Sequence, residues 1–264
     1  MPAAASVGAL DQLRRAVAQI DPNGATLEKG GTLRLGLRAI DAVLQGGLAL
    51  GALHEVTPAS AGQLGAPFGF ALALVVLATE GPGAATALLI GTDFGAYEVG
   101  NPYGPGLDLF GLAADRLLFL QVPRSFDVLW AFEEALKSRA VAAVLAELPE
   151  EGAAADLTAT RRLALAARAG GGLGLLLRQK PSTLPTAAMS RWQVAAAPSL
   201  SDRFGGLGCT AFDLALSRNR RGRDGRFRVC WDHHERSFLP SLSLGMAQTP
   251  CDRPDHAQPL VRAG

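Results

Sequence analysis

Apolar residues follow two patterns along the chain, one typical of helices and one typical of buried strands. Between Val7 and Ile20 they recur three or four positions apart, which predicts an amphipathic helix. Farther on, short continuous apolar runs alternate with helical segments, as in a parallel sheet covered by helices on both faces. The other predicted helices span 37–44, 67–79, 107–112, 127–137 and 157–169, and the predicted strands span 32–35, 53–56, 84–91, 117–121, 141–145, 174–178, 192–196, 211–217 and 226–231.

This order of elements predicts a doubly wound α/β fold with a mostly parallel sheet. The last two strands, joined by a turn at 221–225, predict an antiparallel hairpin at the C-terminal edge. We divide the chain into residues 1–36, a helix and strand that form a candidate docking element, and residues 37–240, the α/β core. Residues 241–264 contain three prolines and little periodicity, so we expect a disordered tail.

Composition narrows the classes of protein that fit. The 264 residues are 48% apolar and carry a formal net charge of +1, which excludes a wholly disordered chain and a globally basic one. Three cysteines without C-x-x-C spacing and four scattered histidines predict no disulfide framework and no zinc site. The start lacks a signal-peptide pattern, and the most apolar stretch, 68–79, is too short to cross a membrane. We therefore expect a cytoplasmic protein.

The first strand-loop-helix unit of such folds is where phosphate groups bind. A P-loop, GxxxxGK[ST], needs glycines for a nest of backbone amides, a lysine for the phosphates and a hydroxyl for magnesium. In this chain the loop runs through Thr57, Ser60 and Gly62, with Gln63 in place of the lysine and Leu64 in place of the hydroxyl residue. The sequence predicts a degenerate nucleotide loop.

Proline and charge weaken the nucleotide site further. Pro67 is favourable only in the first turn of a helix, so we expect the helix to begin near Ala66 and not at Gly62. No Lys or Arg occurs between residues 38 and 116, whereas seven acids do. A triphosphate therefore meets acids and no cation along this stretch, and we expect no ATP or magnesium cofactor.

Two acids and the histidines are the candidates for catalytic residues. Asp93 and Glu147 follow the second and fourth core strands, where nucleotide-hydrolysing enzymes keep a water-positioning acid and a magnesium-binding acid. Without a lysine nearby we interpret both as vestigial. His54 and His233 have no nucleophile or metal-binding spacing around them, and we interpret them as structural. The sequence predicts no catalytic residue.

A cluster of arginines stands out near the C-terminal end of the core. Residues 218–228 hold six arginines against one acid, Asp224, in a chain that is otherwise nearly neutral. The cluster is open to two interpretations, a solvated hairpin tip or a patch that binds phosphate or carboxylate groups through guanidinium forks. Its members are Arg218, Arg220, Arg221, Arg223, Arg226 and Arg228.

Several segments resemble known proteins. Residues 39–56 resemble the entry to the nucleotide-binding core of RecA, and 216–225 resemble a basic turn of RecA-type ATPases that reaches the nucleotide of a neighbouring subunit. Arg218 and Arg220 match the basic positions of that turn. Residues 103–112, 129–136 and 143–148 look like the ImuA family, RecA/SulA-related accessory proteins of the bacterial SOS mutagenesis cassette.

The resemblance implies a RecA-like fold and a role in SOS-induced, error-prone translesion DNA synthesis. It implies an ImuB-like Y-family protein and RecA as partners, an error-prone polymerase as an indirect partner, and self-association through the N-terminal helix. We favour a non-hydrolysing adaptor. Two alternatives stay open: an ATPase completed in trans by Arg218 or Arg220 of a neighbouring subunit, and a SulA-like inhibitor of cell division. Direct contact of the basic hairpin with DNA also stays open.

Overall fold

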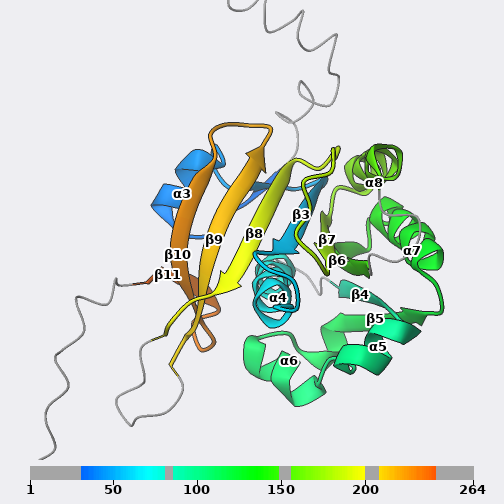
Figure 1. The fold of residues 1–264 in the computed structure, drawn as a ribbon, viewed down its shortest axis with the longest axis horizontal. Helices are drawn as coiled ribbons and strands as arrows, with labels where there is room; N and C mark the ends of the chain where they lie inside the picture. The colour runs from blue at the N-terminus through cyan, green and yellow to red at the C-terminus, as the bar shows by residue number, and fades with distance from the viewer. Residues whose placement is uncertain (1–30, 81–85, 149–155, 200–207, 242–264) are drawn as a thin grey trace, which may run out of the picture.

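The computed structural model describes residues 31–80, 86–148, 156–199 and 208–241. Nine strands form one sheet in the order β11-β10-β9-β8-β3-β7-β6-β4-β5 (Figure 1). They are β3 (Ala52–Pro58), β4 (Thr86–Thr92), β5 (Leu117–Val122), β6 (Val141–Leu148), β7 (Leu173–Arg178), β8 (Ser190–Ala196), β9 (Thr210–Asn219), β10 (Gly225–Asp232) and β11 (Ser237–Pro240). A separate pair, β1 (Thr32–Leu33) and β2 (Leu48–Ala49), is antiparallel.

The sheet is parallel over two thirds of its width. The neighbouring strands from β8 through β3, β7, β6 and β4 to β5 pair in parallel. Strands β9, β10 and β11 join antiparallel at the other side, and the β9–β10 turn is the predicted hairpin. The predicted fold class, an α/β core with a mostly parallel sheet, helices on both faces and an antiparallel hairpin at the C-terminal edge, is confirmed.

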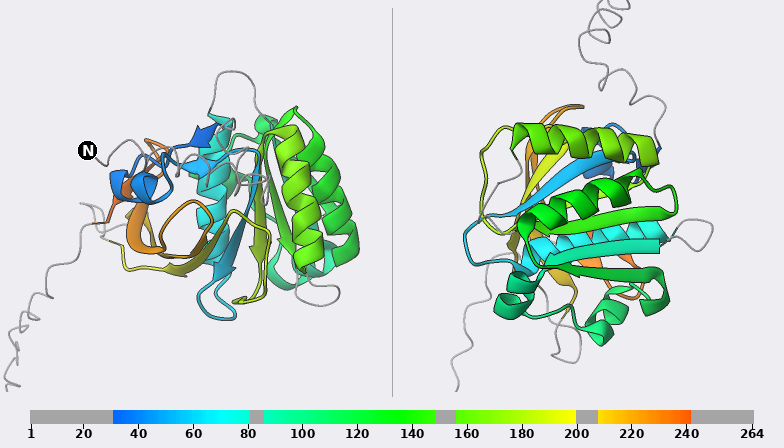
Figure 2. Two further views of the ribbon diagram at one scale, coloured as in Figure 1. Left: turned by 90° about the horizontal axis from the view of Figure 1, so that it is seen from above. Right: turned by 90° about the vertical axis from the view of Figure 1, so that its right-hand side faces the viewer.

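Helices cover both faces of the sheet. The helices are α3 (Arg38–Val43), α4 (Gly65–Thr79), α5 (Asp93–Val99), α6 (Gly104–Phe110), α7 (Ser125–Lys137) and α8 (Leu157–Gly170), with a 3₁₀ turn η2 (Ala114–Arg116). Figure 2 shows α7 and α8 side by side on one face, and α4 on the other. The core accordingly divides into two apolar clusters, one on each face.

Helix α4 lies inside the curve of the sheet and is buried along most of its length. Phe70 on α4 contacts Trp192 of β8, Phe212 of β9 and Phe238 of β11, at ring-centroid distances of 5.6, 6.1 and 5.8 Å. Trp231 of β10 packs edge-on against Phe238 at 5.0 Å. These contacts hold the antiparallel strands against α4 and place Trp231 in the core.

The structure also contains elements that the sequence pattern did not predict. Helix α5 follows β4 directly, because the Thr92 hydroxyl accepts a hydrogen bond from the Gly95 N–H (3.0 Å) and so caps it. Gly100, with a φ of 83°, ends the same helix. Strand β11 was also not predicted. The predicted helix over 7–20 and the predicted disordered tail from 242 onward lie outside the described residues.

Candidate functional site

The loop between β3 and α4 occupies the place of a P-loop. The Ala59 N–H donates to the Val194 carbonyl (3.0 Å), so pairing with β8 continues into the loop. Gly62 has a φ of 83°, a left-handed conformation that favours glycine, and an added Cβ there would meet nothing within 4 Å. The loop therefore turns in open solvent.

The two substituted positions of this loop supply no phosphate-binding group. Gln63 is exposed, and Leu64 is the residue before the first turn of α4, where it makes no side-chain capping hydrogen bond. The helix begins at Gly65, within one residue of the predicted start and three residues after Gly62. Thr57 is buried and donates to the Trp192 carbonyl (3.3 Å), so its hydroxyl is engaged within the sheet.

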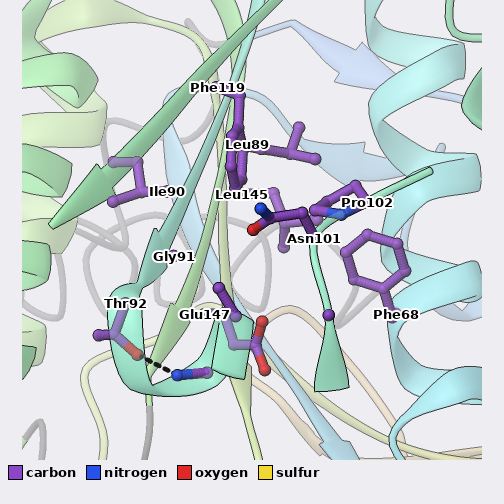
Figure 3. A pocket seen from close by; sticks show the side chains of 13 residues that line it. Phe68, Leu89, Ile90, Gly91, Thr92, Asn101, Pro102, Phe119, Leu145 and Glu147 are labelled. Carbon is purple, nitrogen blue, oxygen red and sulfur yellow. Dashed lines mark hydrogen bonds between the residues drawn. The ribbon is translucent and has the colours of Figure 1, made fainter. Parts of the chain in front are cut away.

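The two acids predicted as vestigial lie in different surroundings. Asp93 is the exposed first residue of α5. Glu147, near the end of β6, is half-buried and accepts a hydrogen bond from Gln179 Nε2 (3.0 Å). Glu147 lines a cavity beyond the strand ends, and Asp93 is not among the residues that line it (Figure 3).

That cavity is small and mainly apolar. Its volume is about 30 Å³, room for one or two water molecules, whereas sites for drug-sized ligands are roughly 300–1,000 Å³. Figure 3 shows Phe68 of α4 and Asn101 and Pro102 of the α5–α6 connection around it, with the Glu147 carboxylate below them. This cavity beyond the strand ends is therefore too small to hold a nucleotide.

The acids of the stretch without cations do not gather around this loop, contrary to the expectation that a phosphate would meet them there. Asp41 accepts from the N–H groups of Leu35 and Gly36 at 2.9 and 3.1 Å, and so holds the segment before α3. Glu80 lies 3.8 Å from Arg236. Glu55 is fully buried on the face of β3 that carries α8, in contact with arginines from later in the chain.

A buried ion cluster around Glu55 was missed by sequence reasoning. Glu55 Oε1 accepts from Arg178 Nη2 (2.9 Å) and from the Thr186 hydroxyl (2.9 Å), and Oε2 accepts from Arg191 Nε (2.6 Å). Arg191 also donates to the carbonyls of Ser182 (3.1 Å) and Leu184 (2.7 Å). The cluster joins β3, β7, β8 and the β7–β8 connection. Its sequence signal was a charged residue in or next to each of three strands expected to be buried, with Glu55 in 53–56, Arg178 in 174–178 and Arg191 directly before 192–196.

His54, next to Glu55 but on the opposite face of β3, is structural as predicted. Its Nε2 lies 2.9 Å from the Ala49 carbonyl, so Nε2 carries the proton and Nδ1 accepts from the Ser190 hydroxyl (2.7 Å). Ser190 Oγ in turn accepts from Trp192 Nε1 (2.9 Å). Burial lowers the pKa of His54 to about 4, the Ala49 hydrogen bond opposes this, and the charge of Arg221 adds to it.

The six clustered arginines divide between the hairpin tip and the strands beside it. The tip is anchored on α3, because Asn219 Nδ2 donates to the Val43 carbonyl (3.0 Å) and Gln45 Nε2 donates to the Arg221 carbonyl. Arg220 and Arg223 are exposed, and Arg221 is half-buried. Hydrogen bonds therefore fix the hairpin tip against α3 and the residues after it, and the side chains of Arg220 and Arg223 are exposed to solvent.

Arg226 and Arg228 lie on the uncovered face of β10, opposite the core-facing Phe227. Arg228 makes a two-pronged ion pair with Asp213 of β9, at 2.7 and 2.8 Å, and these hydrogen bonds raise the pKa of Arg228. A shallow groove on this face is lined by Arg226, Arg228 and Asp213 and by the small side chains of Ala195 and Ala215. This face of β8, β9 and β10 is one candidate contact surface.

Arg218 is the first arginine of the cluster and lies in β9. It pairs with Arg191 across β8 and β9, and its Nε is buried without a hydrogen-bond partner among the described residues. Burial lowers the pKa of Arg218, and the charges of Arg220 and Arg191 lower it further. Arg218 is thus a partly buried cation beside other cations.

Within the described part of the chain, no set of His, Cys, Asp and Glu side chains is arranged to hold a metal ion. None of the helices described there combines the length and the apolar character that a membrane span requires.

Fold and site together define an α/β protein with a mostly parallel sheet, whose nucleotide loop lacks the lysine and hydroxyl of a P-loop. No protein-family profile matches the chain. Protein ImuA of Caulobacter vibrioides, in strains NA1000/CB15N and CB15, is 34% identical over 194 residues, which cover 68% of this chain and 75% of the relative. The chain belongs to the ImuA family, and this membership supports a role in DNA damage-induced mutagenesis.

We predict that Glu55→Gln lowers the free energy of unfolding by about 3–5 kcal/mol, because it leaves two buried guanidinium groups without their counter-charge. Urea denaturation at neutral pH measures this. The matched control is Asp213→Asn, which breaks the exposed pair with Arg228 and should cost at most about 1 kcal/mol. Equal costs for the two variants would contradict a stabilising role of the buried cluster.

A second prediction concerns acid stability. The pKa of His54 is about 4 in the folded chain and about 6.5 when unfolded, so the unfolded state binds the extra proton between these values. Stability is therefore fully present above pH 6.5 and falls as pH decreases toward 4, by about 3 kcal/mol from this group. We expect the free energy of unfolding, measured by urea denaturation, to fall less between pH 7 and pH 4 in His54→Gln than in the parent chain. The difference between the two falls should be about 3 kcal/mol. Parallel pH profiles would refute it.

Proposed function

We propose that this chain is a non-hydrolysing accessory protein of SOS-induced, error-prone translesion DNA synthesis, which works by binding an ImuB-like Y-family protein, RecA or both. The observation that carries the non-hydrolysing part is the nucleotide loop. Gln63 and Leu64 replace the groups that bind phosphate and magnesium, and α4 begins only after them. The partners follow from family membership and from the family resemblance of the sequence.

The cavity beyond the strand ends supports the same proposal. Phosphoryl transfer needs a positioned triphosphate, a metal ion and cationic groups that neutralise developing charge. Glu147 faces a space that holds one or two waters, between Phe68 and Phe119. A single carboxylate in apolar surroundings repels a phosphate and supplies no counter-charge.

The arginines at the hairpin tip and on the uncovered face of β10, which together we call the basic face, supply a contact surface for a macromolecule. Arg223 and Arg226 are exposed, and the hairpin that carries them is fixed on α3 by Asn219. Because this hairpin is already ordered, its guanidinium groups bind carboxylates or phosphates without the loss of conformational entropy that ordering a loop requires. We assign this face to an acidic surface of a protein partner.

One observation favours a second candidate function, an ATPase completed in trans. Arg218 and Arg220 occupy the basic positions of the turn that resembles RecA-type ATPases, and the Nε of Arg218 is buried without a hydrogen-bond partner among the described residues. A nucleotide held by a neighbouring copy would meet the exposed Arg220.

Titration of the purified full chain with ATP and magnesium separates the two functions. We expect no binding in the submillimolar range by calorimetry and no phosphate release, and Arg218→Ala and Arg220→Ala should behave like the parent chain. Submillimolar binding that is lost in either variant would establish the trans-completed site and overturn the non-hydrolysing proposal. Binding that survives both would overturn it as well.

Partner binding is tested with the ImuB-like protein and RecA, each immobilised in turn. Arg223→Glu combined with Arg226→Glu should weaken binding to the partner about tenfold or more, because two attractive contacts become repulsive. The matched control is Arg139→Glu, an exposed arginine after α7, which should have little effect. Equal loss in both variants, or no binding by the parent chain to either protein, would contradict the proposal.

The same variants test whether nucleic acid is the ligand instead. If the hairpin binds single-stranded DNA, the logarithm of affinity falls with the logarithm of salt concentration at a slope of about −0.7 per phosphate contacted. Such a slope, abolished by the double substitution, would replace the protein partner by DNA. We expect no measurable DNA binding at physiological salt.

A further inference from the structure

The two edges of the nine-stranded sheet are built differently. Strand β11 forms one edge and is short, with only four residues, and it ends in Pro240, which has no N–H to offer. Strand β5 forms the other edge and contains no proline, glycine or charged residue over Leu117–Val122. Its pairing with β4 has no bulge. Shortness, proline, charge and bulges are the devices that protect an edge from pairing, and β5 has none of them beyond its modest length.

Both faces of β5 are apolar and open. Leu118 is 56% exposed, Phe119 44% and Leu120 38%, and successive residues of a strand point to opposite faces. Among the described residues only β4 pairs with β5, so the backbone groups on its other side meet no strand. A helix laid on one face would leave the opposite face and the backbone edge uncovered. An added strand pairs with the open backbone edge and places its own side chains beside those of β5 on both faces.

The sequence of β5 suits a second copy of itself. In an antiparallel pair related by a two-fold axis, the central residue lies opposite its own copy. With Phe119 at the centre, Leu118 of each copy faces Leu120 of the other, and Leu117 faces Gln121. This register pairs aromatic with aromatic and leucine with leucine, which are favourable cross-strand pairs.

Charge selects this register over its neighbour. With Leu120 at the centre, Arg116 of each copy would face Arg124 of the other, and like charges directly opposite are destabilising. With Phe119 at the centre, Arg116 faces Val122 instead. Charge therefore disfavours the register centred on Leu120. The register centred on Leu118 places Phe119 opposite Leu117 and so loses the pair of aromatic rings.

We propose that two copies of this chain pair through β5 in antiparallel orientation, with Phe119 facing Phe119, to form one continuous sheet across a two-fold axis. The contact is closed, because each copy uses the same edge, β5, which is the unprotected edge of the sheet in the described part of the chain. It leaves the hairpin and the face of β10 with Arg226 accessible in both copies, so the dimer presents two basic surfaces. The inference does not depend on the proposed function.

Sedimentation of the full chain over a concentration series tests the proposal. We expect a species of twice 27.4 kDa that grows with concentration and no larger assembly. Leu118→Lys combined with Leu120→Lys should raise the dissociation constant about tenfold or more, because each lysine would face another. Leu165→Lys is the matched control, since Leu165 on α8 is 52% exposed and should leave the dimer intact.

A charge-swapped variant tests the register itself. Leu118→Lys combined with Leu120→Glu brings opposite charges together across the axis and should retain the dimer that the two-lysine variant loses. Circular dichroism of both variants shows whether they fold. Recovery in the charge-swapped variant rules out misfolding as the cause of dissociation.

Three results would overturn the proposal. They are a parent chain that stays monomeric throughout the series, a dimer that persists in the folded two-lysine variant, and an open-ended ladder of larger species, which indicates head-to-tail contacts. A parent chain that stays monomeric until the ImuB-like protein or RecA is added, and then loses that binding in the two-lysine variant, would assign β5 to a foreign strand.

Discussion

The wholly apolar helix α4 is the constraint on which the arrangement of the other elements depends. Between Gly65 and Thr79 it carries no charged side chain, and an α-helix without a polar face is stable only where other elements surround it. The sheet therefore curves around α4, and β8 to β11 close over it through Trp192, Phe212 and Phe238. The antiparallel strands complete a core that the parallel strands alone would leave open.

Enclosing α4 changes what its N-terminus can do. In nucleotide-binding proteins the first turn of this helix stays open, so that its N–H groups reach a phosphate. Here Phe68, in the first turn, lines a cavity of water size together with Phe119 and Leu145. Apolar side chains thus line the small cavity beside the start of α4. The substitutions at Gln63 and Leu64 and the small size of this cavity both disfavour the binding of a nucleotide.

The sequence predicted the elements well where a pattern repeats over several residues. The apolar runs of β3, β6 and β7 and the start of α4 were found within a few residues, because burial on both faces and a proline in the first turn leave clear signals. Helix α5 escaped prediction because it has only seven residues and depends on the Thr92 cap. Side-chain partners were harder. Glu55 meets Arg178 and Arg191 from more than 120 positions away. The sequence shows a charge in or beside each of these strands, but it does not show which charges meet.

The positions of the arginines in the structure show that the cluster in the sequence overstates the size of the basic surface. Arg178 and Arg191 lie outside the sequence cluster, yet they neutralise the buried Glu55 and join three strands. Arg228 lies inside the cluster, but Asp213 already engages both edges of its guanidinium group. A partner that approaches β10 must compete with Asp213 for Arg228, whereas Arg226 on the same face has no carboxylate opposite it, since it pairs with Ala215. The attractive part of this face is therefore narrower than a count of charges indicates, and it favours a partner with a few well-placed acids over a long uniform polyanion.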